Sequence, residues 1–274
     1  MIVRLLAMSC LVAWSGHVEA GLASKSGAYE VRPEKMPGPH SSVPVVLVHP
    51  LIDQHPGHLV VFVTGDDGWL ETSSALFEHL SEQGYSLMGF SAPDVLEQVL
   101  SGGHLVRTGD AARGLQQMYA LARRRLALAE KTPVITVGFS RGASVIAFAA
   151  MHPELLEDSA GAIAIALTRQ ADYLYVPMRE WRRGIQFDRQ GRLLFYPAVK
   201  LLASKRVAVI QSTHGVYVPA ALSRQLLGPD TPTLRLYSIE SKSHGFSDAL
   251  ERLMSELDDA LRWVEDSADP IGGT

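Results

Sequence analysis

A serine lies between two glycines in the Gly-Phe-Ser-Arg-Gly segment at residues 138–142, and a serine in this setting can act as a nucleophile. Residues 132–138 form an apolar run typical of a buried strand, whereas the residues after Ser140 follow a helical pattern. A tight turn between a strand and a helix lifts the hydroxyl above the sheet, and glycines let the two elements approach closely. The segment therefore predicts Ser140 as the nucleophile of an acyl transfer, with a purely structural turn as the alternative.

A serine hydroxyl needs a base, and His244 is the candidate that the chain order favours. It follows the last predicted strand, residues 233–239, and precedes a closing helix over residues 247–265. The other histidines fit less well. His214 follows an earlier strand, and His79 and His152 lie in or at the end of helices. Three more precede the first strand-to-helix turn: His49, His55 and His58. We therefore predict His244 as the general base.

Two backbone amides are expected to bind the negative oxygen that forms when an acyl group is attacked. The amide of Arg141 lies at the start of the helix after Ser140 and is predicted to be one donor. The other is predicted to be the amide of Asp66 or Asp67, because the flanking glycines of the segment "FVTGDDGWLE" let amides face inward. The alternative is a solvated acidic turn that caps the next helix.

Apolar runs of strand length alternate with helical patterns from residue 43 to residue 266, which predicts one α/β domain with a mostly parallel sheet covered on both faces. The predicted strands are residues 43–48, 58–64, 85–90, 132–138, 161–167, 206–211 and 233–239. Helices are predicted over residues 73–84 and 110–130, besides the closing helix. Residues 267–274 are predicted to be a flexible tail.

Residues 169–205 interrupt this rhythm and are predicted to form a cap or lid. They contain eight basic and three acidic residues, a local net charge of +5, with aromatic residues between them. Trp69, Tyr173 and Trp181 are the predicted substrate contacts, and the charge suits an anionic, amphiphilic substrate such as a phospholipid headgroup. The alternative is a solvated helical cap with ordinary surface arginines.

The 274 residues are 47% hydrophobic and carry a formal net charge of −4, which predicts a folded core and gives no general attraction to nucleic acid. Residues 1–20 combine Arg4, an apolar stretch and small residues before a cut after residue 20, which predicts a cleaved signal peptide and export. A buried helix, or a lipoprotein signal ending at Cys10, is the alternative. Residues 21–42, rich in Gly, Ser, Pro and Lys, are predicted to be a linker or arm.

Cys10 is the only cysteine, so the mature protein is expected to have no disulfide, no catalytic thiol and no cysteine-based metal site. His49, Asp53, His55 and His58 could be imagined as metal ligands, but their spacing does not justify a site, and a loop with ordinary histidines is favoured. We expect no cofactor.

These motifs together resemble the VirJ/AcvB family of exported bacterial α/β-hydrolase proteins. The likeness covers roughly residues 44–265 and rests on the Gly-Asp-Asp-Gly-Trp loop at residues 65–69, the elbow "GFSRGASV", the late "SKSHGF" segment, and "RTGDAARGL" before the elbow strand. It implies an α/β-hydrolase fold, a periplasmic location and hydrolysis of aminoacyl esters of phosphatidylglycerol. In some members it also implies a link to virulence and type IV secretion.

One position departs from the pattern of this fold. The acid that orients the histidine is expected after the strand at residues 206–211, where the chain has Gly215. Asp172 is the preferred substitute, and Asp188 and Asp230 are weaker candidates. A catalytic pair of serine and histidine without an acid is the alternative.

Three functions are consistent with these residues. The first is a periplasmic serine esterase that acts on a phospholipid or another ester at the membrane surface. The second, favoured by Gly215, is a non-catalytic periplasmic adaptor that binds lipids or secretion-system components. The third is a carboxylesterase or thioesterase for soluble small molecules.

Overall fold

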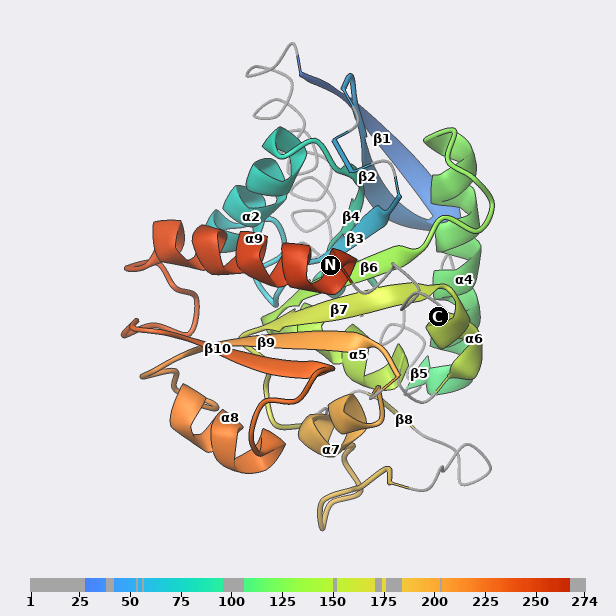
Figure 1. Cartoon of the computed structure of the whole chain (residues 1–274). Coiled ribbons are helices and arrows are strands. Elements are labelled where there is room, and N and C mark those ends of the chain that lie inside the picture. Colours follow the sequence, from blue (N-terminus) through green and yellow to red (C-terminus); the bar gives the residue numbers. More distant parts are fainter. Residues whose placement is uncertain are drawn as a thin grey trace, which may run out of the picture.

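The computed structural model describes residues 28–37, 42–52, 54–55, 57–95, 106–149, 152–170, 174–175, 184–202 and 204–266 (Figure 1). Within these residues, eight strands form one sheet in the order β1-β2-β4-β3-β6-β7-β9-β10. From one edge to the other they are β1 (Tyr29–Pro37), β2 (Ser42–Pro50), β4 (Ser86–Phe90), β3 (Leu59–Val63), β6 (Val134–Phe139), β7 (Ser159–Ile165), β9 (Arg206–Ser212) and β10 (Leu234–Ile239). The first two pairings are antiparallel and all the others are parallel.

Helices cover both faces of the sheet and bury two separate apolar clusters (Figure 1). On one face lie α2 (Glu71–Glu82) and α9 (Leu250–Glu265). The other face is covered by α4 (Thr108–Arg125), α5 (Ser144–Ala149), α6 (Pro153–Glu157), α7 (Phe195–Lys200) and α8 (Ala220–Leu227). The central strands are buried on both faces, which explains why they read as continuous apolar runs.

The chain reverses its direction of travel across the sheet at β3. It moves from β3 to β4 on one side and then crosses back to β6 on the other side. Ligands of open α/β sheets bind beyond the carboxyl ends of the strands at such a switch point. The loops that follow β3 and β6 are therefore the expected place for a site.

The segment predicted as a linker or arm, residues 21–42, contains regular structure, because Tyr29–Pro37 forms the edge strand β1. Each of these nine residues pairs with a residue of β2, and the side chains of Tyr29 and Met36 are buried. Two prolines in this segment lack a backbone N–H, which an edge strand tolerates because one of its sides has no partner strand.

The predicted cap over residues 169–205 needs a similar correction. Its last part contains α7, where Phe195 and Tyr196 are fully buried and belong to the core cluster that α4 and α5 share. Two further residues of the segment form the short strand β8 (Leu174–Tyr175), which pairs in parallel with β5 (Val106–Arg107). Tyr173 and Trp181 lie outside the described residues.

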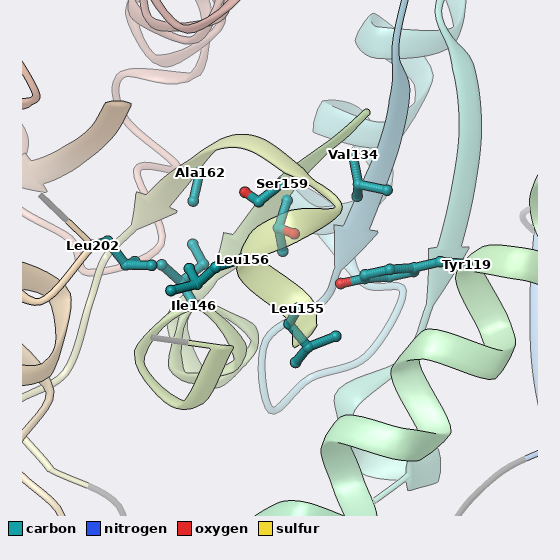
Figure 2. A pocket seen from close by; sticks show the side chains of 9 residues that line it. Tyr119, Val134, Ile146, Leu155, Leu156, Ser159, Ala162 and Leu202 are labelled. Atoms are coloured by element: carbon teal, nitrogen blue, oxygen red, sulfur yellow. The ribbon is translucent and has the colours of Figure 1, made fainter. Parts of the chain in front are cut away.

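A small cavity lies beneath α4, α5 and α6, as Figure 2 shows. Its lining is mostly apolar and includes the hydroxyl groups of Tyr119, Thr136 and Ser159. The other lining residues are Val134, Ile146, Leu155, Leu156, Ala162 and Leu202. Val134 and Ser159 are the first residues of β6 and β7, so the cavity lies toward the amino ends of these strands, whereas Ser140 follows the carboxyl end of β6. The cavity is therefore not part of the predicted site.

In the described part of the chain, no helix has the length and apolarity that crossing a membrane requires. His, Asp and Glu side chains of the same residues form no group that could hold a metal ion. Of the four imagined ligands, Asp53 is outside the described residues. His55 stacks on Tyr85 with ring centroids 3.7 Å apart, and its Nδ1 lies 3.1 Å from a carboxylate oxygen of Glu265.

Candidate active site

Ser140 lies at a strained turn between β6 and a short 3-10 helix, η1 (Ser140–Ala143). Its φ of 51° is in the left-handed region, which a residue other than glycine rarely adopts. The flanking glycines are required by contact: a Cβ on Gly138 would lie 2.4 Å from the Gly142 carbonyl oxygen, and a Cβ on Gly142 would lie 2.2 Å from the Val63 carbonyl oxygen. The turn therefore has the strand-to-helix geometry of a nucleophile elbow.

The structure brings together the two side chains that the sequence predicted as nucleophile and base. His244 Nε2 lies 2.8 Å from Ser140 Oγ, although 104 positions separate the residues. When Nδ1 carries the ring proton, Nε2 accepts the hydrogen of the serine hydroxyl, as a general base requires. The rings of Tyr217 and His244 pack edge to face, with centroids 4.8 Å apart.

Burial lowers the pKa of His244 below its ordinary value of 6.5, and the negative charges of Asp66 and Asp67 partly oppose this shift. A buried imidazole loses hydration that its cationic form needs more than its neutral form does. The neutral form, which can accept a proton, is therefore favoured near neutral pH.

The loop after β10 carries His244 and is closed by its own side chains. The carboxylate of Asp248 accepts hydrogen bonds from Ser241 Oγ at 2.5 Å and from the Lys242 amide at 2.9 Å. These two bonds lower the pKa of Asp248. Ser212 Oγ, at the end of β9, donates to the Ser241 carbonyl oxygen at 2.7 Å and joins this loop to the neighbouring strand. Asp248 was not among the residues predicted from the sequence, although Asp and Ser residues in a short loop are typical of such turns.

The loop after β3, residues 64–70, lies directly against the nucleophile. A Cβ on Gly65 would lie 3.3 Å from Ser140 Cβ. The Gly68 amide donates to the Gly65 carbonyl oxygen at 3.2 Å, which closes a tight turn with Asp66 and Asp67 at its tip. Within the described residues, the amides of these two aspartates donate no hydrogen bond. The amides of Asp66 and Asp67 therefore stay the predicted second donor to an oxyanion beside Ser140.

Arg141 and Trp69 fix the position of this loop from its two ends. The guanidinium of Arg141 pairs with the carboxylate of Asp66. The ring of Trp69 packs edge-on against Phe77, with centroids 5.0 Å apart, and lies near Phe62 in the core. These contacts give Trp69 a packing role, and its contact with substrate stays a prediction.

No carboxylate among the described residues pairs with or hydrogen-bonds to His244. Gly215 occupies the position expected for the acid. Asp188 binds Arg192 and Asp230 binds Arg224, so both weaker candidates have other partners. Asp172 lies outside the described residues and remains the preferred prediction.

Comparisons with known proteins agree with this picture. The model of a family described as bacterial virulence protein (VirJ) matches residues 57–216, more than half of the chain. The matched residues include the loop at 65–69 and the elbow, and they end before His244. No curated protein gives a match.

Solved structures of low sequence identity share the fold. A Klebsiella pneumoniae protein described as a dienelactone hydrolase has a TM-score of 0.62 and 15% identity over 87% of this chain and 99% of its own. A Pyrococcus furiosus esterase has a TM-score of 0.56 and 13% identity over 86% and 93%. A Xanthomonas campestris α/β serine hydrolase without a lid has a TM-score of 0.56 and 15% identity over 85% and 94%. The predicted α/β-hydrolase fold is thus confirmed.

Proposed function

The chain belongs to the VirJ family of bacterial virulence proteins, and from this premise we propose that it is a serine hydrolase that cleaves carboxylic esters. The observation that carries the proposal is the 2.8 Å contact between Ser140 Oγ and His244 Nε2 at a strained strand-to-helix turn. The φ of Ser140 is strained, and such strain is found mainly at functional sites because the surrounding structure must over-determine it.

The residues support a two-stage reaction. Ser140 Oγ attacks the ester carbonyl carbon while its proton passes to His244 Nε2, and amides of Arg141 and Asp66 or Asp67 bind the oxyanion. The intermediate then collapses, the alcohol leaves with the proton from Nε2, and an acyl-Ser140 ester remains. Water gives a proton to His244 and attacks the acyl carbon, and the second collapse releases the carboxylic acid and restores the hydroxyl.

We propose aminoacyl esters of phosphatidylglycerol in the periplasm as the substrate. The family resemblance supports this choice, and so does the surface around the site. Val216 and Tyr217 are 79% and 64% exposed beside His244, and they offer apolar contacts to a lipid. Asp66 and Asp67 carry negative charges close enough to raise the pKa of His244, and Asp67 would attract the ammonium group of an aminoacyl ester.

Replacement of the nucleophile tests the activity. The purified mature protein and Ser140→Ala are incubated with a fluorophosphonate probe, then with aminoacyl-phosphatidylglycerols and with short p-nitrophenyl esters. We expect labelling and ester cleavage by the native protein and neither by the variant. Turnover that is unchanged in Ser140→Ala would rule out the serine mechanism, and a preference for the soluble esters would favour a small-molecule carboxylesterase.

A non-catalytic adaptor for lipids or secretion components is the second candidate, and Gly215 at the expected acid position is the observation that favours it. Under this alternative the native protein would not react with the probe under any condition tested. Fractionation of cells that express the full chain tests the periplasmic location.

A further inference from the structure

Thr72, in the first turn of α2, hydrogen-bonds to the loop that carries His244. Its Oγ1 donates to the carbonyl oxygen of Gly245 at 2.6 Å across 173 positions of sequence. The threonine is 7% exposed, so this hydroxyl has little access to water as a substitute partner. The acceptor belongs to the residue directly after the histidine, so the bond fixes the backbone on one side of the imidazole.

Phe246 fixes the same backbone one residue further on. Its ring is completely buried in the cluster between the sheet, α2 and α9, yet its φ is 57°. A bulky residue in the left-handed region is uncommon, and such strain persists only where the surroundings over-determine the conformation. The loop is thus held by an apolar anchor at Phe246 and by a hydrogen bond at Gly245.

Three contacts join the segments that supply the chemistry into a closed ring. The elbow binds the loop after β3 through Arg141 and Asp66. That loop leads directly into α2, where Thr72 binds the base loop at Gly245. The base loop returns to the elbow through His244 and Ser140. A displacement at any one contact would therefore move the groups at the others.

We propose that Thr72 is a positioning residue for the base: its hydroxyl fixes the loop so that His244 Nε2 stays within hydrogen-bond distance of Ser140. The inference rests on the proposed function. In hydrolases of this fold the acid orients the imidazole, and here a hydrogen bond to the backbone beside the imidazole contributes to its orientation. Thr72 touches neither substrate nor the reacting atoms.

Removal of the hydroxyl at constant shape is the direct test. We expect Thr72→Val to lower kcat by about tenfold or more with little change in KM, because a small displacement of a catalytic group costs rate rather than binding. Thr72→Ser keeps the hydroxyl and is expected to restore most of kcat. Thr136→Val is the matched control: Thr136 is also 7% exposed and its hydroxyl bonds Tyr119, at a distance from the site.

A readout that does not need turnover separates this proposal from the proposed function. The imidazole of His244 is titrated by nuclear magnetic resonance in ¹⁵N-histidine protein, with His244→Gln used for assignment. In Thr72→Val the ring should become more hydrated, so its pKa should rise toward 6.5, while Thr72→Ser and Thr136→Val titrate like the native protein.

A titration of His244 in Thr72→Val that coincides with that of the native protein would overturn the proposal, as would a loss of kcat equal to that in Thr136→Val. An inactive native protein with a shifted titration in Thr72→Val would overturn the hydrolase assignment and leave the positioning role intact. If Thr72→Val does not fold, Thr72→Ala removes the same hydroxyl and is measured in the same way.

Discussion

The guanidinium of Arg141 binds the carboxylate of Asp66, so two residues expected to offer backbone amides to an oxyanion also hold each other through their side chains. The pair is partly exposed, with side chains 29% and 56% accessible, and its free energy alone is therefore small. Its importance lies in geometry, since it keeps the loop after β3 against the elbow.

A double-mutant cycle on this pair measures that role. Arg141→Met and Asp66→Asn should each lower kcat/KM, and the double variant should lose little more than either one, with a coupling energy of about 0.2–1 kcal/mol. Kinetics of the four proteins give the coupling. Strict additivity of the two effects would show that the pair does not position the loop.

The acidic limb of the activity profile should report His244. The imidazole accepts a proton only when neutral, and burial lowers its pKa, so kcat/KM should fall to half its plateau at a pH below 6.5. Asp67→Asn removes a charge that raises this pKa, so the midpoint should move to lower pH, and less so at high salt. A midpoint above 6.5 in the native protein would contradict the assignment of His244 as the base.

Gly142 is expected to tolerate no side chain. A Cβ at this position would lie 2.2 Å from the Val63 carbonyl oxygen, so Gly142→Ala must push η1 away from β3 and should cost about 1–3 kcal/mol of unfolding free energy as well as activity. Gly57→Ala is the control, because a Cβ on Gly57 meets no atom within 4 Å. Chemical denaturation of both variants tests the difference, and equal stability would show that the elbow is less tightly packed than described.

A carboxylate can be introduced by substitution at Gly215, the position expected for the acid. A Cβ on Gly215 would make only ordinary contacts, the nearest 3.6 Å from Ser212 Cβ, so Gly215→Asp should fold. A carboxylate beside the base loop should raise the pKa of His244 because it stabilises the cationic imidazole, whereas Gly215→Asn should not.

The same variant tests Asp172. If Asp172 is the acid, Asp172→Asn lowers kcat, and Gly215→Asp in that background restores part of it. Unchanged kcat in Asp172→Asn would leave the Ser140–His244 pair without an acid from that segment.

Features that depend on local sequence were predicted, whereas features that depend on contacts between distant segments were not. The elbow was predicted because a buried strand, a glycine pair and a helix lie within one short stretch, so local chemistry determines it. β1 was missed because Pro33 and Pro37 read as linker, and only pairing with β2 makes a strand of them. α7 was missed because Phe195 and Tyr196 look like lid aromatics until the fold buries them.

The contacts around His244 were the least predictable. A threonine at the start of a helix reads as an ordinary first-turn residue, and its bond to Gly245 depends on how two distant segments meet. Gly215 shows the opposite case: the sequence revealed the missing carboxylate, but only the structure shows that a Cβ would fit there.

The sequence separation between Ser140 and His244 also links chemistry to the folding reaction. The serine follows the fifth strand of the sheet along the chain, while the histidine follows the last, so contacts spanning 104 and 173 positions must form before a nucleophile is activated. An incompletely folded chain would be unable to attack an acyl group. The rate at which a refolding chain becomes reactive toward an active-site probe should therefore report when these long-range contacts form.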